Sequence, residues 1–170
     1  MNRLQLATIL SWAGESGVQG RKRLQKVIYF LQQAGCNLNC AYTLHHFGPY
    51  SRDVADACDE MVAARLIDET TSSQDWGIQY SYKLAPGTQA LLDRAADQSM
   101  DPYRTLATTL ISQDLWQLEL GSTIHFFYGQ TGDWERALEE ACAFKKVSAS
   151  DDRSQKALAL ARRVLEYTGN

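Results

Sequence analysis

The sequence has few helix-breaking residues and no long apolar segment. Its 170 residues include three prolines, Pro49, Pro86 and Pro102, so most of the chain is free to form helices. No apolar run approaches the ~20 residues that span a bilayer, and residues 1–5 lack the apolar core of a secretion signal. We therefore expect a cytoplasmic protein that has no membrane partner.

Cysteine is also scarce, and its spacing does not indicate a metal site. The four cysteines form no CxxC pair; they are Cys36, Cys40, Cys58 and Cys142. Structural zinc sites usually contain two such pairs, or one pair with two spaced histidines. Disulfides are characteristic of secreted proteins. We expect four reduced thiols, no metal and no cofactor, with a redox pair of Cys36 and Cys40 as the less supported alternative.

Motifs of catalysis are missing as well. The sequence has no GxGxxG, GxSxG or HExxH pattern. His45 and His46 are adjacent in a segment that we interpret as a strand, so their side chains should point to opposite faces, with one of them in the core. No nucleophile or carboxylate is spaced to work with either histidine. We therefore expect a protein that is not an enzyme.

The charge of the chain is uneven. The formal net charge is −3, but residues 1–53 hold six Lys or Arg against two Asp or Glu, whereas residues 54–170 hold eleven against eighteen. An acidic majority argues against non-specific binding of nucleic acid, which depends on neutralising phosphates. Because the first third of the chain is basic, a local contact with nucleic acid stays an alternative.

Helical periodicity is the strongest positive signal in the first half. Leu24, Val27, Ile28 and Leu31 follow the i, i+3, i+4, i+7 spacing of a core-facing stripe, and Gly35 comes where a helix commonly ends. The pattern predicts a helix over 21–34, with further helices over 4–14, 52–65 and 88–96. Strands are predicted over 42–47, 66–67 and 78–84, with a turn over 48–51 and a polar loop over 70–77.

The second half is predicted to be helical throughout, with helices over 114–128, 133–146 and from residue 151 onward. The whole pattern predicts a mainly α-helical α+β protein with a small antiparallel β wing. We interpret residues 1–97 as a winged helix-turn-helix domain and residues 98–170 as a helical extension packed on it.

Several segments resemble the YwgA-like family of small bacterial and archaeal proteins. They are residues 20–31, 45–51, 65–69 and 118–124. The pairing of LQK at residues 24–26 with FGPYS at residues 47–51 is also similar to the Panacea-type antitoxin domain. The resemblance implies a winged-helix fold and regulation or neutralisation through binding. It supplies no catalytic residues.

The helix over 52–65 carries an acidic surface. Its expected exposed residues are Arg52, Asp53, Asp56, Asp59 and Glu60. In a winged helix this element would enter the DNA major groove, but four carboxylates beside one guanidinium should repel phosphates. We interpret the surface as a site for a basic protein partner, such as a toxin or a nucleic-acid enzyme. A merely solvated acidic face is the alternative.

A basic cluster opens the helix over 21–34. Its members are Arg21, Lys22, Arg23 and Lys26. Because the N-terminal end of a helix dipole disfavours cations, we expect these charges to be available to an outside partner, nucleic acid included. Solubilising charge with stems packed on apolar neighbours is the alternative. Trp76, at the predicted wing tip, either contacts a partner or packs back on the wing.

These observations favour a non-catalytic regulatory binding module, antitoxin-like or adaptor-like, that contacts a protein partner through the acidic helix and the wing. The alternative is a winged-helix transcription regulator that binds DNA through the basic cluster and the wing. A homodimer, and a small ligand between the two halves, stay open at this point.

Overall fold

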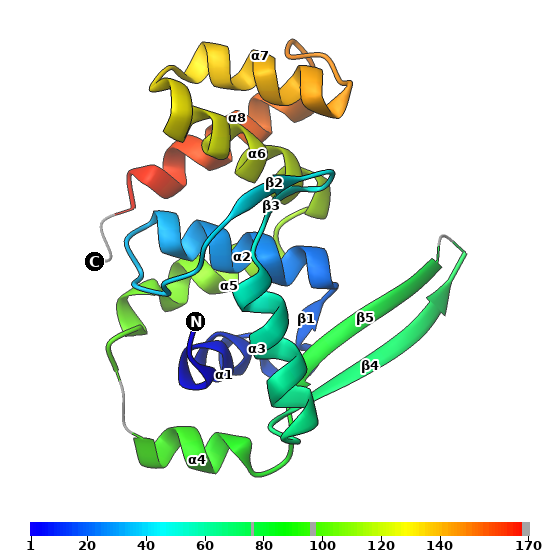
Figure 1. Cartoon of the computed structure of the whole chain (residues 1–170), viewed down its shortest axis with the longest axis vertical. Coiled ribbons are helices and arrows are strands. Elements are labelled where there is room, and N and C mark those ends of the chain that lie inside the picture. The colour runs from blue at the N-terminus through cyan, green and yellow to red at the C-terminus, as the bar shows by residue number, and fades with distance from the viewer. Residues whose placement is uncertain (76, 96–97, 168–170) are drawn as a thin grey trace.

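The computed structural model describes residues 1–75, 77–95 and 98–167, and within them the chain has a mixed α+β fold (Figure 1). The helices are α1 (Arg3–Trp12), α2 (Arg21–Gln33), α3 (Arg52–Ala63), α4 (Thr88–Ala95), α5 (Arg104–Ser112), α6 (Leu115–Thr131), α7 (Trp134–Lys145) and α8 (Asp152–Leu165). The strands are β1 (Val18–Gln19), β2 (Thr43–His45), β3 (Gly48–Tyr50), β4 (Ile67–Gln74) and β5 (Gly77–Leu84).

The larger sheet has the strand order β1–β5–β4, and both pairings are antiparallel. β4 and β5 form a hairpin with Ile67 opposite Leu84, and the hairpin projects away from the helices (Figure 1). Gly17, just before β1, has a positive φ of 60°, and a Cβ there would lie 2.3 Å from the carbonyl oxygen of Tyr82. Glycine therefore lets the chain enter this sheet close to β5.

The polar segment over 70–77 is largely strand, so the predicted loop is wrong. β4 continues through Gln74, and Thr70 pairs with Ser81. Near its tip the hairpin buries little surface on either face. Its residues there need not alternate between apolar and polar, which is the pattern that would identify a strand. The predicted turn over 48–51 is also wrong, because β3 pairs with β2 in a second, two-stranded sheet.

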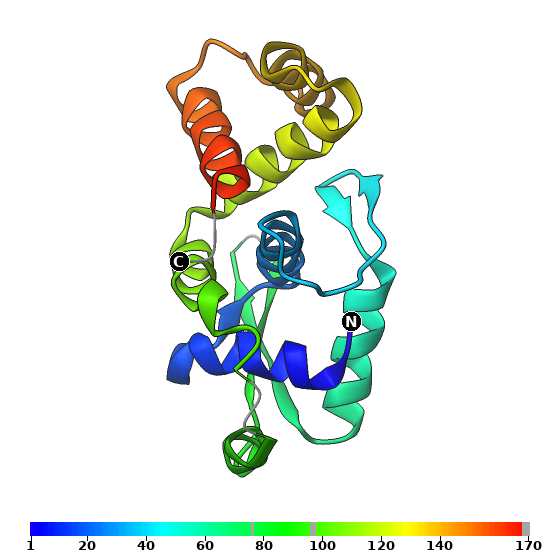
Figure 2. The ribbon, with the colours of Figure 1, turned by 90° about the vertical axis from the view of Figure 1, so that its left-hand side faces the viewer.

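Helix α2 lies at the centre of the core. The stripe predicted for it is confirmed, since Leu24, Val27, Ile28 and Leu31 are all buried. The core around α2 also takes in apolar side chains of the second half, on α5, α6 and α8; they are Leu106, Ala107, Leu110, Leu118, Leu160 and Val164. Three helices of the second half, α5, α6 and α8, therefore pack directly on α2 (Figure 2).

A second apolar cluster joins α6, α7 and α8; its buried members include Ile124, Ala137, Ala141 and Ala161. Small side chains let these helices approach closely. At Gly121 of α6, an added Cβ would lie 3.0 Å from the carbonyl oxygen of Ala157 on α8.

All four cysteines are free thiols, as the sequence predicted, and all four are buried. Burial raises the pKa of the Cys58 thiol to about 12 and that of Cys36 to about 11, so neither forms a reactive thiolate near neutral pH. No helix in the part of the chain that the structure describes is both long enough and apolar enough to cross a bilayer.

Candidate functional site

A groove of about 560 Å³ lies between the start of α2, the β2–β3 hairpin and the first half of α3. Members of both charged sets named from the sequence line it. They are Arg21, Lys22 and Lys26 from the basic cluster, with Arg52, Asp56 and Asp59 from the acidic helix. The structure therefore joins into one site two clusters that the sequence treated as separate.

The groove is held in shape by hydrogen bonds between α2 and the segment that leads into α3. Gln25 Nε2 donates to the carbonyl oxygen of Ser51, and Ser51 N donates to Gln25 Oε1, both at 2.9 Å. Lys26 Nζ donates to the carbonyl oxygen of Pro49 at 2.5 Å. The LQK and FGPYS motifs are therefore in direct contact, and their side chains fix the position of α3 relative to α2.

The hairpin is also fixed from the other side, by α6. Gly48 has a φ of +94°, and a Cβ there would lie 2.6 Å from Thr123 Oγ1. Glycine is needed both for this backbone conformation and for the close contact. The neighbouring Phe47 remains 46% exposed at the rim of the groove.

Lysines from α2 and α7 surround one glutamate of α6 at this rim. Lys22 Nζ and Lys145 Nζ each lie 3.6 Å from a carboxylate oxygen of Glu119. Lys22 Nζ also lies 3.3 Å from the centre of the Phe47 ring, a cation–π contact. Burial lowers the pKa of Lys26 to about 8, and the nearby Glu119 offsets part of that effect.

The acidic residues of α3 face solvent, as expected. Arg52 Nε pairs with Asp56 Oδ1 at 2.9 Å, and Glu60 pairs with Arg3 of α1 at 3.0 Å. These pairs are exposed and contribute little to stability. Asp53 instead accepts a hydrogen bond of 2.7 Å from the backbone N–H of Ala41, which ties α3 to the segment before β2.

Two cations of the basic cluster are held within the protein, which corrects the expectation that they are available to a partner. Arg21 donates to Glu69 at 2.8 Å and to the Tyr82 hydroxyl at 2.7 Å, linking α2 to the β4–β5 hairpin. Arg23 donates to carbonyl oxygens at the end of α5, that of Ile111 at 2.9 Å. These acceptors offset the unfavourable interaction of the two cations with the N-terminal end of the α2 dipole.

Comparison with known proteins places the chain in a family. No protein-family profile matches it. YwgA of Bacillus subtilis (strain 168), an uncharacterized protein, is 31% identical over 125 residues, which cover 74% of each chain. The chain belongs to the YwgA family. The resemblance to YwgA-like proteins is thereby confirmed.

In this YwgA-family protein the two histidines of the hairpin are both exposed, so the expectation that one lies in the core is wrong. His45 stacks on Tyr50 at 4.6 Å, and His46 contacts the Phe47 ring edge-on at 4.9 Å. Among the described residues no group of three or more His, Cys, Asp or Glu is arranged to hold a metal. Trp76, predicted as a partner contact, lies outside the described residues.

A buried histidine of this YwgA-family protein was not singled out from the sequence. His125 of α6 is 4% exposed, and its Nδ1 lies 3.2 Å from the hydroxyl of Tyr29. Burial lowers its pKa to about 4, so the ring is neutral at neutral pH. Its Nε2 and the Tyr42 hydroxyl are buried and have no hydrogen-bond partner among the described residues. Its position in an otherwise apolar and aromatic stretch of α6 was the only available signal.

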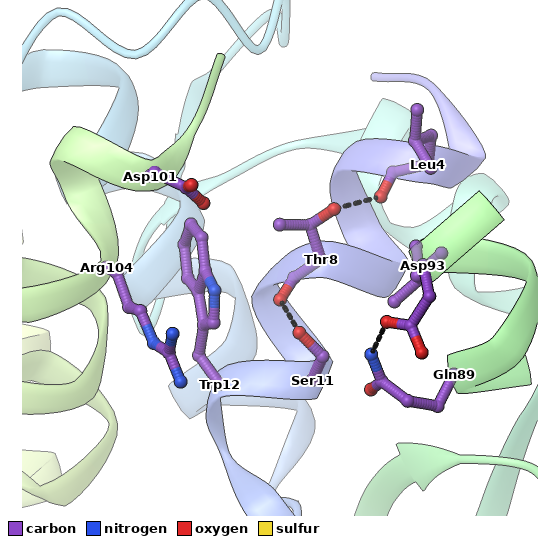
Figure 3. Close-up of a pocket in the computed structure, with 9 residues that line it drawn as sticks. Leu4, Thr8, Ser11, Trp12, Gln89, Asp93, Asp101 and Arg104 are labelled. Atoms are coloured by element: carbon purple, nitrogen blue, oxygen red, sulfur yellow. Dashed lines mark hydrogen bonds between the residues drawn. The ribbon is translucent and has the colours of Figure 1, made fainter. Parts of the chain in front are cut away.

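A separate pocket of about 430 Å³ lies between α1, α4 and the start of α5 (Figure 3). Its hydroxyls bond within their own helix, Thr8 to the carbonyl of Leu4 and Ser11 to that of Thr8. Gln89 likewise bonds to Asp93 of the same helix (Figure 3). These bonds stay within single helices, whereas the groove brings together charged side chains from α2 and α3, so the charged groove is the stronger candidate site.

Proposed function

We propose that this chain is a non-catalytic, regulatory binding module with a winged-helix scaffold. The helices and strands follow the order α1, β1, α2, β2, β3, α3, β4, β5. Apart from the β2–β3 hairpin inserted between α2 and α3, this order and the β1–β5–β4 sheet are typical of such a scaffold, with α2 and α3 as the helix-turn-helix pair and β4–β5 as the wing. Its role is antitoxin-like or adaptor-like, in the cytoplasm, through binding of a protein partner.

The observation that carries this proposal is the mixed charge of the groove. Asp56 and Asp59 line the same groove as Lys22 and Lys26. A nucleic-acid backbone presents negative charge at every phosphate and would meet carboxylates along α3. A polypeptide can present an acidic residue to one wall and a basic residue to the other, so charge complementarity favours a protein.

The wing supports the same preference. Between residues 67 and 84 it carries the acids Asp68, Glu69 and Asp75 and a single basic residue, Lys83. A wing that follows a phosphate backbone would need the opposite balance. DNA binding is the second candidate, and it is favoured by Lys22, whose side chain remains 44% exposed.

Site-specific cross-linking in the native host tests the proposal. A photo-reactive amino acid replaces Ala55, which lines the groove, or Ala159, which is exposed on α8. We expect a defined protein adduct from position 55 and none from position 159. Equal adducts at the two positions, or none at position 55, would contradict a partner in the groove. An adduct of twice the chain's own mass would identify a homodimer.

Equilibrium binding to duplex DNA at two salt concentrations separates the two candidates. We expect weak binding that does not depend on Lys22. Tight binding that weakens steeply with salt, and that is reduced in a Lys22→Ala variant, would instead support the transcription regulator.

A further inference from the structure

We propose that the lysine cluster, defined as Lys22, Lys26, Lys145 and their shared neighbour Glu119, binds a carboxylate of the protein partner. This inference rests on the proposed function, because the carboxylate belongs to the protein partner proposed there. It adds the orientation of the partner's segment in the groove: an acidic residue of that segment faces the lysine cluster, and a basic residue faces α3.

Charge balance at the lysine cluster favours an anionic ligand. The lysine cluster brings three ammonium groups to one carboxylate, and Glu119 is the acid that pairs with Lys22 and Lys145. Within the described residues no other carboxylate lies within 4.0 Å of any of the three lysines. The cluster therefore holds an excess of positive charge in a partly buried place, where an anion interacts more strongly than at an open surface.

Lys26 is a buried ammonium group in the wall of the groove. Its side chain is 2% exposed, lines the groove, and has the carbonyl oxygen of Pro49 as its acceptor. An ammonium group has three N–H donors, and a buried charge is stabilised chiefly by a charged partner. A carboxylate in the groove would supply that partner.

The acidic side of the groove and two exposed aromatic rings favour a carboxylate over a phosphate chain. Asp56 and Asp59 line the same groove, so neighbouring phosphates of a nucleic acid would face like charge. The aromatic rings of Phe47 and Phe144, 46% and 39% exposed, lie beside Lys145 and offer apolar surface to the rest of a polypeptide. An acidic side chain flanked by apolar residues fits this combination.

Titration of the purified chain with sodium acetate, followed by NMR of its labelled lysine side chains at constant ionic strength, tests the inference. We expect saturable shifts at the three clustered lysines. Lys26→Met should weaken acetate binding about tenfold, and Lys156→Met, at an exposed lysine of α8, should leave it unchanged. Glu119→Gln should tighten binding, because it removes the competing carboxylate.

Lys145→Met provides the same test if Lys26→Met does not fold, and it should weaken acetate binding to a similar degree. Shifts that do not saturate, or that are equal in the Lys26→Met and Lys156→Met variants, would overturn the site. Binding of inorganic phosphate that is tighter than that of acetate and depends on Lys26 would overturn the carboxylate assignment. Because acetate is added to the chain alone, this result is independent of the cross-linking from position 55.

Discussion

Gln25 and Ser51 exchange two hydrogen bonds, each 2.9 Å long, between the side-chain amide of one and the backbone of the other. Both residues are buried, and they join the centre of α2 to the residue immediately before α3. The amide accepts from the buried backbone N–H of Ser51 and donates to the carbonyl oxygen of Ser51, which also accepts from the N–H of Ala55 at 3.4 Å. This contact fixes one wall of the groove relative to the other.

Gln25→Ala should therefore destabilise the protein. We expect the free energy of unfolding to fall by about 2 kcal/mol, because the buried N–H of Ser51 loses its acceptor and the carbonyl of Ser51 keeps only the bond from Ala55. Urea denaturation measures the change. Gln89→Ala, at an exposed position of α4, is the matched control and should change stability by less than about 0.5 kcal/mol. Equal effects of the two substitutions would refute the role of Gln25.

Two glycines should respond to alanine in opposite directions. Gly48→Ala places a methyl group at a φ of +94° and against Thr123, so we expect a loss of about 2 kcal/mol of stability. Gly129 lies in α6 with open space around its Cβ position, so Gly129→Ala should stabilise the protein by about 0.5–1 kcal/mol. Thermal unfolding of the two variants gives both signs, and a neutral Gly48→Ala would contradict the tight contact of the hairpin with α6.

His125 should make the protein sensitive to mild acid. Burial lowers its pKa from 6.5 to about 4, so between those values the unfolded chain binds a proton that the folded chain does not. Stability is thus unaffected by this group above pH 6.5 and falls as the pH decreases toward 4, by up to about 3 kcal/mol.

Urea denaturation at pH 7 and at pH 4.5 checks this expectation. The loss of stability between the two values should be smaller in His125→Gln, which removes the titrating ring. The same loss in both proteins would show that other groups control the acid response.

The α-helical part of the fold could be predicted from the sequence, and the sheets could be predicted only in part. The apolar stripe of α2 is a local signal, and the structure confirms it. β1 has two residues and β4 ends in a polar run, so neither carries an alternation that sequence reasoning detects.

The charged groove could not be predicted, because it depends on contacts between distant segments. The sequence showed a basic cluster and an acidic helix, and it paired the LQK and FGPYS motifs through resemblance alone. It did not show that Gln25 and Lys26 bond to residues 49–51 and so bring Lys22 and Asp56 to the same groove. The interior position of His125 likewise depends on how α6 packs on α2.

Charge reversal on α3 tests the central claim most directly. Its effect is measured as the yield of the cross-linked adduct from position 55. Asp56→Lys plus Asp59→Lys should lower that yield at least about tenfold, since both residues line the groove. Glu135→Lys plus Glu139→Lys, on exposed positions of α7, should leave it unchanged. An adduct that forms equally well in both variants would contradict a partner bound by the acidic wall of the groove.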